Sequence, residues 1–241
     1  MKLSVVIPAY NEEGSIGDVV RNLYAKLCEE KIEHEILIIY DNSSDGTLEV
    51  LRALIAEIPT LRIDDRKSPP KGFGLALQRG LEIFSGDAVV FYMSDGCDSR
   101  DDLVLFFRTM EKEGVDCVFG SRFIKGGKMI GCPPLKHVLN RLGNTFIRLL
   151  FGLRYNDVTN GFKLYRRKVI DGTRPYLGRH FNFSAELALK SINRGYTFAV
   201  VPNSWVNRKT GKSGFNVQKL APIYLFTVFY CFFEKKLLRH D

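Results

Sequence analysis

An acidic segment near the middle of the chain has the residue types of a metal site. Asp95 follows the apolar run Ala88–Met93, and further carboxylates come three to seven residues later. Carboxylate oxygens bind Mg²⁺ or Mn²⁺, and a metal held there can clamp a diphosphate. Asp101 and Asp102 instead suit the start of the next helix, whose dipole favours negative charge. Asp95 ends a strand that needs no cap, so we predict it as a metal ligand.

A second acidic residue, Asp41, ends the apolar run Glu35–Tyr40. Its carboxylate could accept a hydrogen bond from a nucleobase or a ribose, or could cap the next helix, although Asp45 or Thr47 is better placed for capping. The nearby Lys71-Gly72-Phe73-Gly74 resembles a phosphate loop only loosely, because it lacks the glycine spacing of dinucleotide-binding and nucleotide-triphosphate loops.

Basic residues beside glycine and serine are candidates for binding phosphate. Arg122, Arg208 and Lys212 have such neighbours, and an arginine can grip phosphate through two donors, although each residue alone also suits a solvated surface. The 35 lysines and arginines exceed the 27 acidic residues by eight charges, which favours an anionic partner. Nucleic acid is not expected, because the chain lacks a clustered basic helix or a stacking aromatic motif.

The first 120 residues alternate between apolar strands and amphipathic helices. The predicted strands are Leu3–Pro8, Glu35–Tyr40, Leu61–Asp64, Ala88–Met93 and Val115–Gly120. The predicted helices are one that begins after Ser15, then Thr47–Ile58, Gly74–Phe84 and Asp101–Glu113. This pattern predicts an α/β domain with a mainly parallel sheet covered by helices on both faces. Ligands of such sheets bind beyond the C-terminal ends of the strands, where the polar segments lie.

The second half of the chain is less regular. We expect a loop at Lys125–Pro134, a helix at Leu135–Phe151, a turn and short strand within Asn156–Arg167, a helix at Asn182–Arg194 and a strand at Thr197–Val201. The composition, 45% hydrophobic and 26% charged, is that of an ordinary globular protein. Five cysteines without a CxxC spacing favour a reducing compartment over a disulfide framework or a zinc site.

The C-terminal segment Leu220–Phe233 is almost wholly apolar, and cations such as Lys235 and Lys236 follow it. It is shorter than the roughly 20 residues that span a bilayer. An aromatic segment beside cations suits the membrane interface, where anionic lipids attract the charges. The alternative is a helix that packs on the domain or on a second subunit of a homo-oligomer.

Several motifs together resemble those of family 2 glycosyltransferases with the GT-A fold, a Rossmann-like nucleotide-diphospho-sugar transferase fold. Two segments carry the general resemblance, Val5–Glu13 and Asp41–Thr47. Three others resemble the dolichyl-phosphate mannose synthase branch of polyprenyl-phosphate hexosyltransferases, Gly120–Phe123, Asp157–Lys163 and Asn207–Ser213. The resemblance covers nearly all of an expected catalytic domain at residues 1–217, with residues 218–241 as a tail.

The resemblance implies inverting transfer of a hexose from a nucleotide diphosphate sugar, of GDP-mannose or UDP-glucose type, to a polyprenyl phosphate at the cytoplasmic face of a membrane, with Mg²⁺ or Mn²⁺. The implied catalytic residues are Asp95, Arg122 and Arg208. The implied donor-binding residues are Pro8, Tyr10, Glu12, Asp41, Lys71, Ser94 and Asp95. The implied residues for the acceptor phosphate are Arg122, Lys136, Asn140, Lys212 and Ser213. Lys136, Asn140 and Asn144 have a spacing of four, which puts them on one helix face.

The sequence departs from the family pattern at the metal motif. Met93 stands where the first Asp of that motif is expected, and Cys97 replaces a Gln that commonly helps to bind the metal. Asp98 is then the second predicted metal ligand. Two alternatives stay open. One is a family 2 transferase that acts on a sugar hydroxyl with Asp95, Asp98 or Asp157 as base, and the other is a lapsed nucleotide-sugar-binding module.

Overall fold

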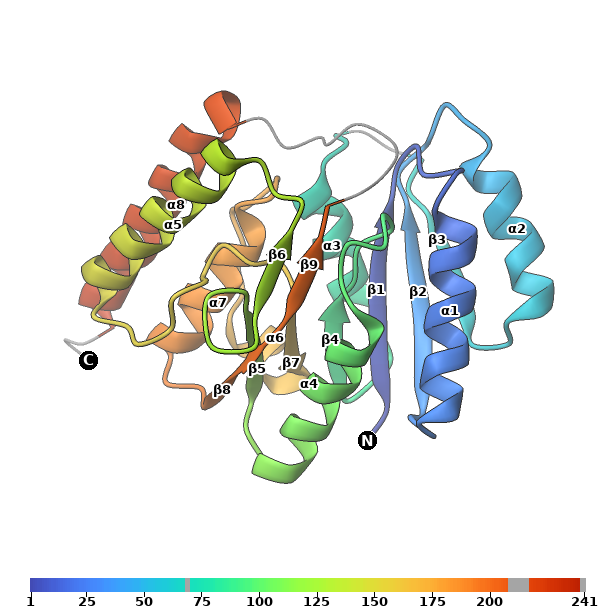
Figure 1. Cartoon of the computed structure of the whole chain (residues 1–241), viewed down its shortest axis with the longest axis horizontal. Coiled ribbons are helices and arrows are strands. Elements are labelled where there is room, and N and C mark those ends of the chain that lie inside the picture. Colours follow the sequence, from blue (N-terminus) through green and yellow to red (C-terminus); the bar gives the residue numbers. More distant parts are fainter. Residues whose placement is uncertain (68–69, 208–216, 239–241) are drawn as a thin grey trace.

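The apolar runs of the first half form parallel strands in the computed structural model, which describes residues 1–67, 70–207 and 217–238. The strands are β1 (Leu3–Ala9), β2 (His34–Tyr40), β3 (Leu61–Asp65), β4 (Ala88–Phe91) and β5 (Cys117–Ser121). They belong to a seven-stranded sheet of order β3-β2-β1-β4-β7-β5-β8, in which β7 (Lys163–Arg166) is antiparallel to its neighbours and β8 (Phe198–Pro202) is parallel to β5 (Figure 1). The predicted α/β architecture is therefore confirmed.

Helices cover both faces of this sheet because alternate residues of each strand point to opposite faces. Val5 and Ile7 of β1 pack against the helices α1 (Ile16–Glu29), α2 (Thr47–Glu57) and α4 (Arg100–Glu113). Val6 of β1 lies in a second core with the remaining helices. These are α3 (Phe73–Ile83), α5 (Pro134–Phe151), α6 (Arg167–Gly172), α7 (Phe183–Asn193) and α8 (Val217–Leu237). Burial on both faces explains why the strands read as continuous apolar runs.

Three short elements lie where the sequence predicts none. The expected loop Lys125–Pro134 contains β6 (Lys128–Ile130), which pairs in parallel with β9 (Ser204–Val206). Both strands have only three residues and stay partly exposed, so they carry no apolar pattern that periodicity could detect. Helix α6 is likewise too short for a helical stripe.

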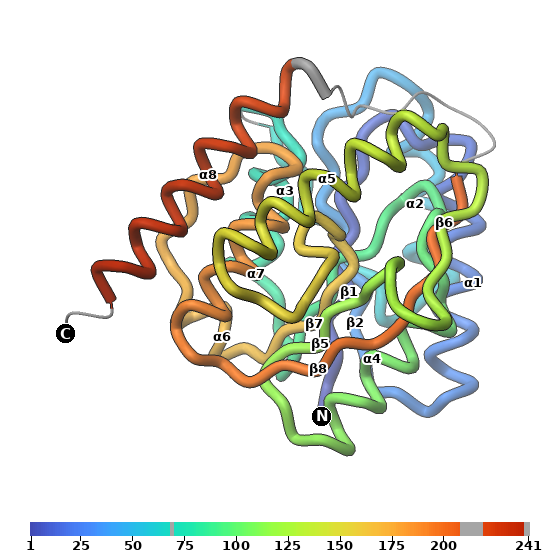
Figure 2. Tube along the Cα trace, turned by 60° about the vertical axis from the view of Figure 1, so that its left-hand side comes forward, coloured from blue at the N-terminus to red at the C-terminus, as the bar shows by residue number. Residues whose placement is uncertain are grey.

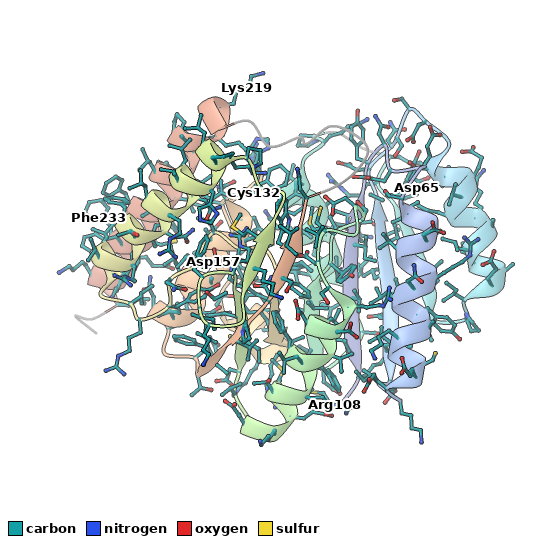
Figure 3. The ribbon with its side chains drawn as sticks, viewed as in Figure 1. Asp65, Arg108, Cys132, Asp157, Lys219 and Phe233 are labelled. Carbon is teal, nitrogen blue, oxygen red and sulfur yellow. The ribbon has the colours of Figure 1, made fainter. Side chains whose placement is uncertain are left out.

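The apolar C-terminal segment is part of the long helix α8, which lies beside α5 (Figure 2). Ring contacts join the two helices, with centroids of Phe146 and Phe229 at 6.2 Å. One side of α8 is buried on the domain, and Glu234 pairs with Arg194 of the α7 C-cap at 2.7 Å. The other side is exposed, as Phe233 shows at the edge of the molecule (Figure 3). Among the described residues, no helix is long and apolar enough to cross a membrane.

Candidate active site

The C-terminal ends of the parallel strands bring the predicted polar segments to one edge of the sheet. Ala9 of β1 pairs with Tyr40 of β2, so Tyr10 and Asp41 leave the sheet side by side. β4 runs parallel to β1, and Ser94 and Asp95 follow it at the same edge.

Asp41 lies in the part of this edge where the family resemblance leads us to expect the donor. It is buried, and its Oδ1 and Oδ2 accept hydrogen bonds from Arg66 Nη1 and the Gly72 amide, each at 3.2 Å. Lys71 donates from Nζ to the Asn42 carbonyl at 2.8 Å and lies 5.0 Å from the Tyr10 ring. Asp41 does not cap a helix. The N-cap of α2 is Gly46, so the expectation that Asp45 or Thr47 caps this helix was wrong; Asp45, one residue earlier, accepts from the Thr47 amide at 3.1 Å through its Oδ1.

A buried ion pair on α7 holds the segment that packs against Gly74, close to Lys71, and the sequence analysis missed this pair. Glu186 and Lys190 are fully buried and 3.0 Å apart, and Glu186 accepts hydrogen bonds from the amides of Leu177 and Gly178. The following carbonyl, that of Arg179, accepts from the Gly74 amide at 3.0 Å. A Cβ on Gly74 would lie 2.5 Å from the Gly178 oxygen, so the turn after Lys71 needs glycine there.

The acidic pair Asp95 and Asp98 faces a cavity of about 460 Å³. Asp95 Oδ1 accepts from the Cys97 amide at 3.0 Å, and Asp98 is buried. Burial and the negative charge of Asp95 raise the pKa of Asp98 to about 7. A divalent cation would relieve this repulsion. Among the described residues no group of three or more His, Cys, Asp or Glu could hold a metal. Two carboxylates still fit Mg²⁺, which takes its other ligands from substrate phosphates and water.

The two aspartates expected at the helix start differ in their contacts. Asp101 is exposed and lies 3.4 Å from Lys26. Asp102 Oδ2 accepts from the Ser204 amide at 2.6 Å, while Ser99 at the N-cap accepts from the Asp102 amide at 3.4 Å. Asp102 therefore fixes the first residue of β9, and neither aspartate lines the cavity.

Arg122 lies at the wall of the same cavity, paired with Asp157. Its Nε and Nη2 donate to the two carboxylate oxygens of Asp157 at 2.8 and 2.7 Å, and its amide donates to Oδ2 at 2.9 Å. Burial alone lowers the pKa of the guanidinium, but the charge and hydrogen bonds of Asp157 outweigh it and raise the pKa of Arg122. The pair uses Nε and Nη2 of Arg122 and both carboxylate oxygens of Asp157, which leaves Asp157 poorly suited as a base.

Helices α5 and α8 form the apolar part of the cavity. Lys136 and Asn140 of α5 line it near its charged end, and Lys136 Nζ lies 5.2 Å from the Trp205 ring. Asn144 is buried instead, where it fixes Thr159 through two hydrogen bonds. The apolar lining from the two helices includes Leu139, Phe146, Tyr224, Leu225 and Val228, and Phe73, Met129 and Phe181 add apolar lining from other segments. A cavity that is charged at one end and apolar at the other suits an amphipathic ligand.

The structure thus brings part of the predicted site together. Five predicted residues line one cavity, namely Asp95, Asp98, Arg122, Lys136 and Asn140. Six lie at the sheet edge outside it, namely Pro8, Tyr10, Glu12, Asp41, Lys71 and Ser94. Three fall outside the described residues, namely Arg208, Lys212 and Ser213. Sequence reasoning missed Trp205 and Arg66, since a lone aromatic and a lone basic residue carry no pattern.

Comparisons with known proteins show the family of the chain. The family model for Glycosyl transferase family 2 matches residues 4–173. A polyprenol monophosphomannose synthase of Mycolicibacterium smegmatis is 27% identical over 223 residues, covering 89% of this chain and 82% of that protein. An undecaprenyl-phosphate mannosyltransferase of Micrococcus luteus is 25% identical over 222 residues, covering 88% and 87% of the two chains.

Solved structures resemble the chain in fold. A glucosyl-3-phosphoglycerate synthase from Mycobacterium tuberculosis, in complex with Mn²⁺, UDP and phosphoglyceric acid, has a TM-score of 0.71 at 19% identity, covering 96% of this chain and 78% of that one. The same enzyme with Mg²⁺ and UDP gives a TM-score of 0.69 at 20% identity, covering 95% and 79%. At this identity the likeness concerns the fold alone.

Proposed function

The chain belongs to glycosyltransferase family 2, and from this premise we propose that it transfers a hexose, with inversion, from a nucleotide diphosphate sugar to a polyprenyl phosphate. Its fold is the GT-A fold, as the sequence resemblance implies. One observation carries the proposal. The cavity joins the carboxylates of Asp95 and Asp98 to apolar walls on α5 and α8.

The shape of this cavity favours a lipid phosphate as acceptor. Leu139, Phe146 and Leu225 line the cavity and are also 41 to 48% exposed, so its apolar end reaches the surface. A polyprenyl chain could leave along this end while its phosphate stays near Lys136 and Arg122. The names of both curated relatives support a polyprenyl phosphate acceptor and a mannosyl donor. GDP-mannose is therefore the first donor to test, with UDP-glucose second.

The proposed reaction is a direct displacement at the anomeric carbon. An oxygen of the acceptor phosphate forms the new bond to that carbon, and the bond to the nucleoside diphosphate breaks with its electron pair. A phosphate monoester is largely anionic at neutral pH, since its second pKa is about 6, so the acceptor needs positioning and no base. Arg122 Nη1 and Lys136 orient the acceptor phosphate, and the acidic edge binds the donor. A divalent metal bound by Asp95 and Asp98 would neutralise charge on the departing diphosphate.

A second candidate function is transfer to a sugar hydroxyl. A hydroxyl acceptor needs a general base, whose pKa is best near the working pH. The pKa of Asp98, about 7, meets this requirement, which favours Asp98 over Asp157 and its ion pair with Arg122. The structures of the glucosyl-3-phosphoglycerate synthase concern an enzyme of this fold with a small acceptor.

We also propose that the protein binds the membrane surface peripherally, on the cytoplasmic side, through α5 and α8. Exposed apolar side chains gather on the outer faces of the two helices. They include Leu135, Leu142 and Leu149 of α5 and Phe226, Phe229 and Phe233 of α8. Such a continuous apolar surface indicates a membrane or a protein partner. A homo-oligomer through the same face is the competing arrangement.

A matrix of donors and acceptors tests the proposed function. Purified protein is incubated with GDP-mannose or UDP-glucose, with Mg²⁺ or Mn²⁺, and with a short polyprenyl phosphate, the matching polyprenol or phosphoglyceric acid. We expect a hexosyl lipid by mass spectrometry with the polyprenyl phosphate alone. Product with the other acceptors would show transfer to a hydroxyl, the chemistry of the second candidate function, and donor binding without any product would indicate the lapsed module.

A further inference from the structure

A small polar pocket lies on the side of α5 away from the reaction cavity. Its volume is about 80 Å³, and its lining residues are Arg141, Asn144, Thr145, Arg148 and Asn156. At 100° per residue, Arg141, Thr145 and Arg148 lie roughly 120–180° around the helix from Lys136, which lines the reaction cavity. Asn144 lies between the two flanks and donates to Asn140 Oδ1 at 2.8 Å, so this hydrogen-bonded pair separates the arginines from the proposed transfer site.

The pocket has an excess of positive charge. Arg141 and Arg148 are exposed, and neither forms an ion pair with a carboxylate within residues 1–67, 70–207 and 217–238. Arg141 stacks on the Phe123 ring at 4.6 Å, which limits the positions of its guanidinium. The side-chain amides of Asn144 and Asn156 already donate hydrogen bonds within the protein, Asn144 to the Thr159 hydroxyl and Asn156 to the Phe123 carbonyl. The guanidinium groups of Arg141 and Arg148 and the hydroxyl of Thr145 are then the donors that could bind an anion. The paired N–H donors of a guanidinium match the geometry of phosphate.

The apolar stripe of α5 runs directly beside this pocket. Leu142 and Leu149 each follow a pocket arginine in sequence, and both are exposed, at 62 and 71%. A helix with an apolar face and arginines along its edge is typical of one that lies in the plane of a bilayer interface. There the arginines would meet lipid phosphates at the depth where the leucines enter the acyl region.

We propose that the Arg141–Arg148 pocket binds the phosphate of an anionic phospholipid headgroup and thereby fixes the orientation of the α5–α8 face on the membrane. This inference rests on the proposed function in one respect, since a polyprenyl acceptor is what would bring this face to a bilayer. The two lipids then occupy opposite flanks of α5, the acceptor on the side of Lys136 and the headgroup on the side of Arg141.

Vesicle binding by matched double variants tests the inference. Arg141→Gln/Arg148→Gln removes two charges from the pocket, and Arg52→Gln/Lys112→Gln removes two exposed charges from α2 and α4. Binding is measured by flotation with vesicles of phosphatidylcholine alone and with about one third phosphatidylglycerol. We expect the pocket variant to lose on the order of tenfold to thirtyfold in affinity for the anionic vesicles, since each surface cation contributes about one tenfold step or less. The control variant should stay within about twofold.

Other outcomes would overturn the inference. An equal loss of affinity for anionic vesicles in both double variants would indicate that the whole charge of the protein, and not this pocket, attracts it to the membrane. The wild-type protein could instead fail to bind anionic vesicles and form a dimer. If sedimentation then shows that Arg141→Gln/Arg148→Gln is monomeric, the face binds a second copy of the chain. If calorimetry shows inorganic phosphate saturating the pocket while phosphatidylglycerol vesicles do not displace it, the pocket serves a free anion. Melting curves check the fold of each variant.

Transfer activity separates this inference from the proposed function. The pocket variant should still transfer hexose to a short soluble acceptor. If neither the wild-type protein nor any variant does so, the proposed function is refuted, whereas the vesicle-binding result still tests the pocket.

Discussion

Arg122 and Asp157 form a two-pronged ion pair at the wall of the cavity, with both partners buried and both carboxylate oxygens engaged. The Tyr155 hydroxyl shares its one proton between the Asp157 backbone carbonyl at 2.6 Å and the Gly120 carbonyl at 2.9 Å, and it thereby links the loop after α5 to the end of β5. The Arg122–Asp157 pair fixes the position of Arg122, and in the proposed function Nη1 of Arg122 contacts the acceptor phosphate.

Removing the acidic partner of this pair should destabilise the protein strongly. Asp157→Asn leaves the buried guanidinium without a counter-charge, and such losses cost about 3–5 kcal/mol. Asp171→Asn, at an exposed position of α6, serves as the control and should change the free energy of unfolding by less than about 0.5 kcal/mol. Urea unfolding of both variants measures the difference. Equal stability of the two would mean that the ion pair contributes nothing to the fold.

The metal assignment gives a second prediction. Asp95→Asn should weaken metal-dependent binding of a nucleoside diphosphate at least tenfold, because it removes one of two charged ligands. Asp101→Asn is the control, since Asp101 is exposed and lies outside the cavity. Calorimetry with Mg²⁺ or Mn²⁺, and again with a chelator, separates the metal-linked part. The metal assignment is wrong if Asp95→Asn and Asp101→Asn weaken metal-dependent nucleotide binding equally.

The pKa of Asp98 predicts a dependence of stability on pH. The pKa is about 7 in the folded chain, and its ordinary value is 3.8. Between these values the unfolded chain releases a proton that the folded chain keeps, so the contribution of Asp98 to stability is full below about pH 4 and is lost as the pH rises to about 7. The free energy of unfolding should fall by at most about 4 kcal/mol over this pH range.

Urea unfolding without metal at about pH 4 and pH 8 checks this prediction. Asp98→Asn should be less sensitive to pH than the wild-type protein, and added Mg²⁺ should restore wild-type stability at the higher pH. Identical pH profiles of the two proteins would show that Asp98 does not hold its proton in the fold.

A pair of glycine substitutions tests the support of the donor side. Gly74→Ala brings a Cβ to 2.5 Å from the Gly178 carbonyl and should cost about 1–3 kcal/mol while weakening donor binding. Gly143→Ala, in the middle of α5, meets nothing within 4 Å and should stabilise the helix by about 0.5–1 kcal/mol. Thermal melting and nucleotide titration compare them. A Gly74→Ala protein as stable as Gly143→Ala would show that the turn adapts freely.

The sequence predicts the sheet and its covering helices well because the strands are buried on both faces. Leu3–Pro8 and Glu35–Tyr40 need nothing beyond their apolar runs to be recognised, and the structure extends each by one residue. The strands β6 and β9 could not be predicted, since each has three partly exposed residues without an apolar pattern and their partners, such as Asp102 at the Ser204 amide, are far away in sequence.

The candidate site is less predictable from sequence than the fold. The sequence places Asp95 and Lys136 by motif, and the structure brings both to one cavity. It does not reveal that Arg122 is held by Asp157, because the two are 35 residues apart and meet only through tertiary packing. Tyr224 and Val228 of α8 were equally hidden. An apolar helix gives no indication in its sequence of which side lines a cavity.

The central claim is that an oxygen of a polyprenyl phosphate attacks the sugar. Its most direct test uses a short polyprenyl phosphate whose phosphate oxygens carry ¹⁸O, with GDP-mannose or UDP-glucose and Mg²⁺ or Mn²⁺. Mass spectrometry then follows the label. We predict a hexosyl phosphoryl lipid that retains every labelled oxygen, together with an unlabelled nucleoside diphosphate. Free hexose alone, or a hexose attached to an acceptor hydroxyl while the labelled lipid is unchanged, would contradict the account.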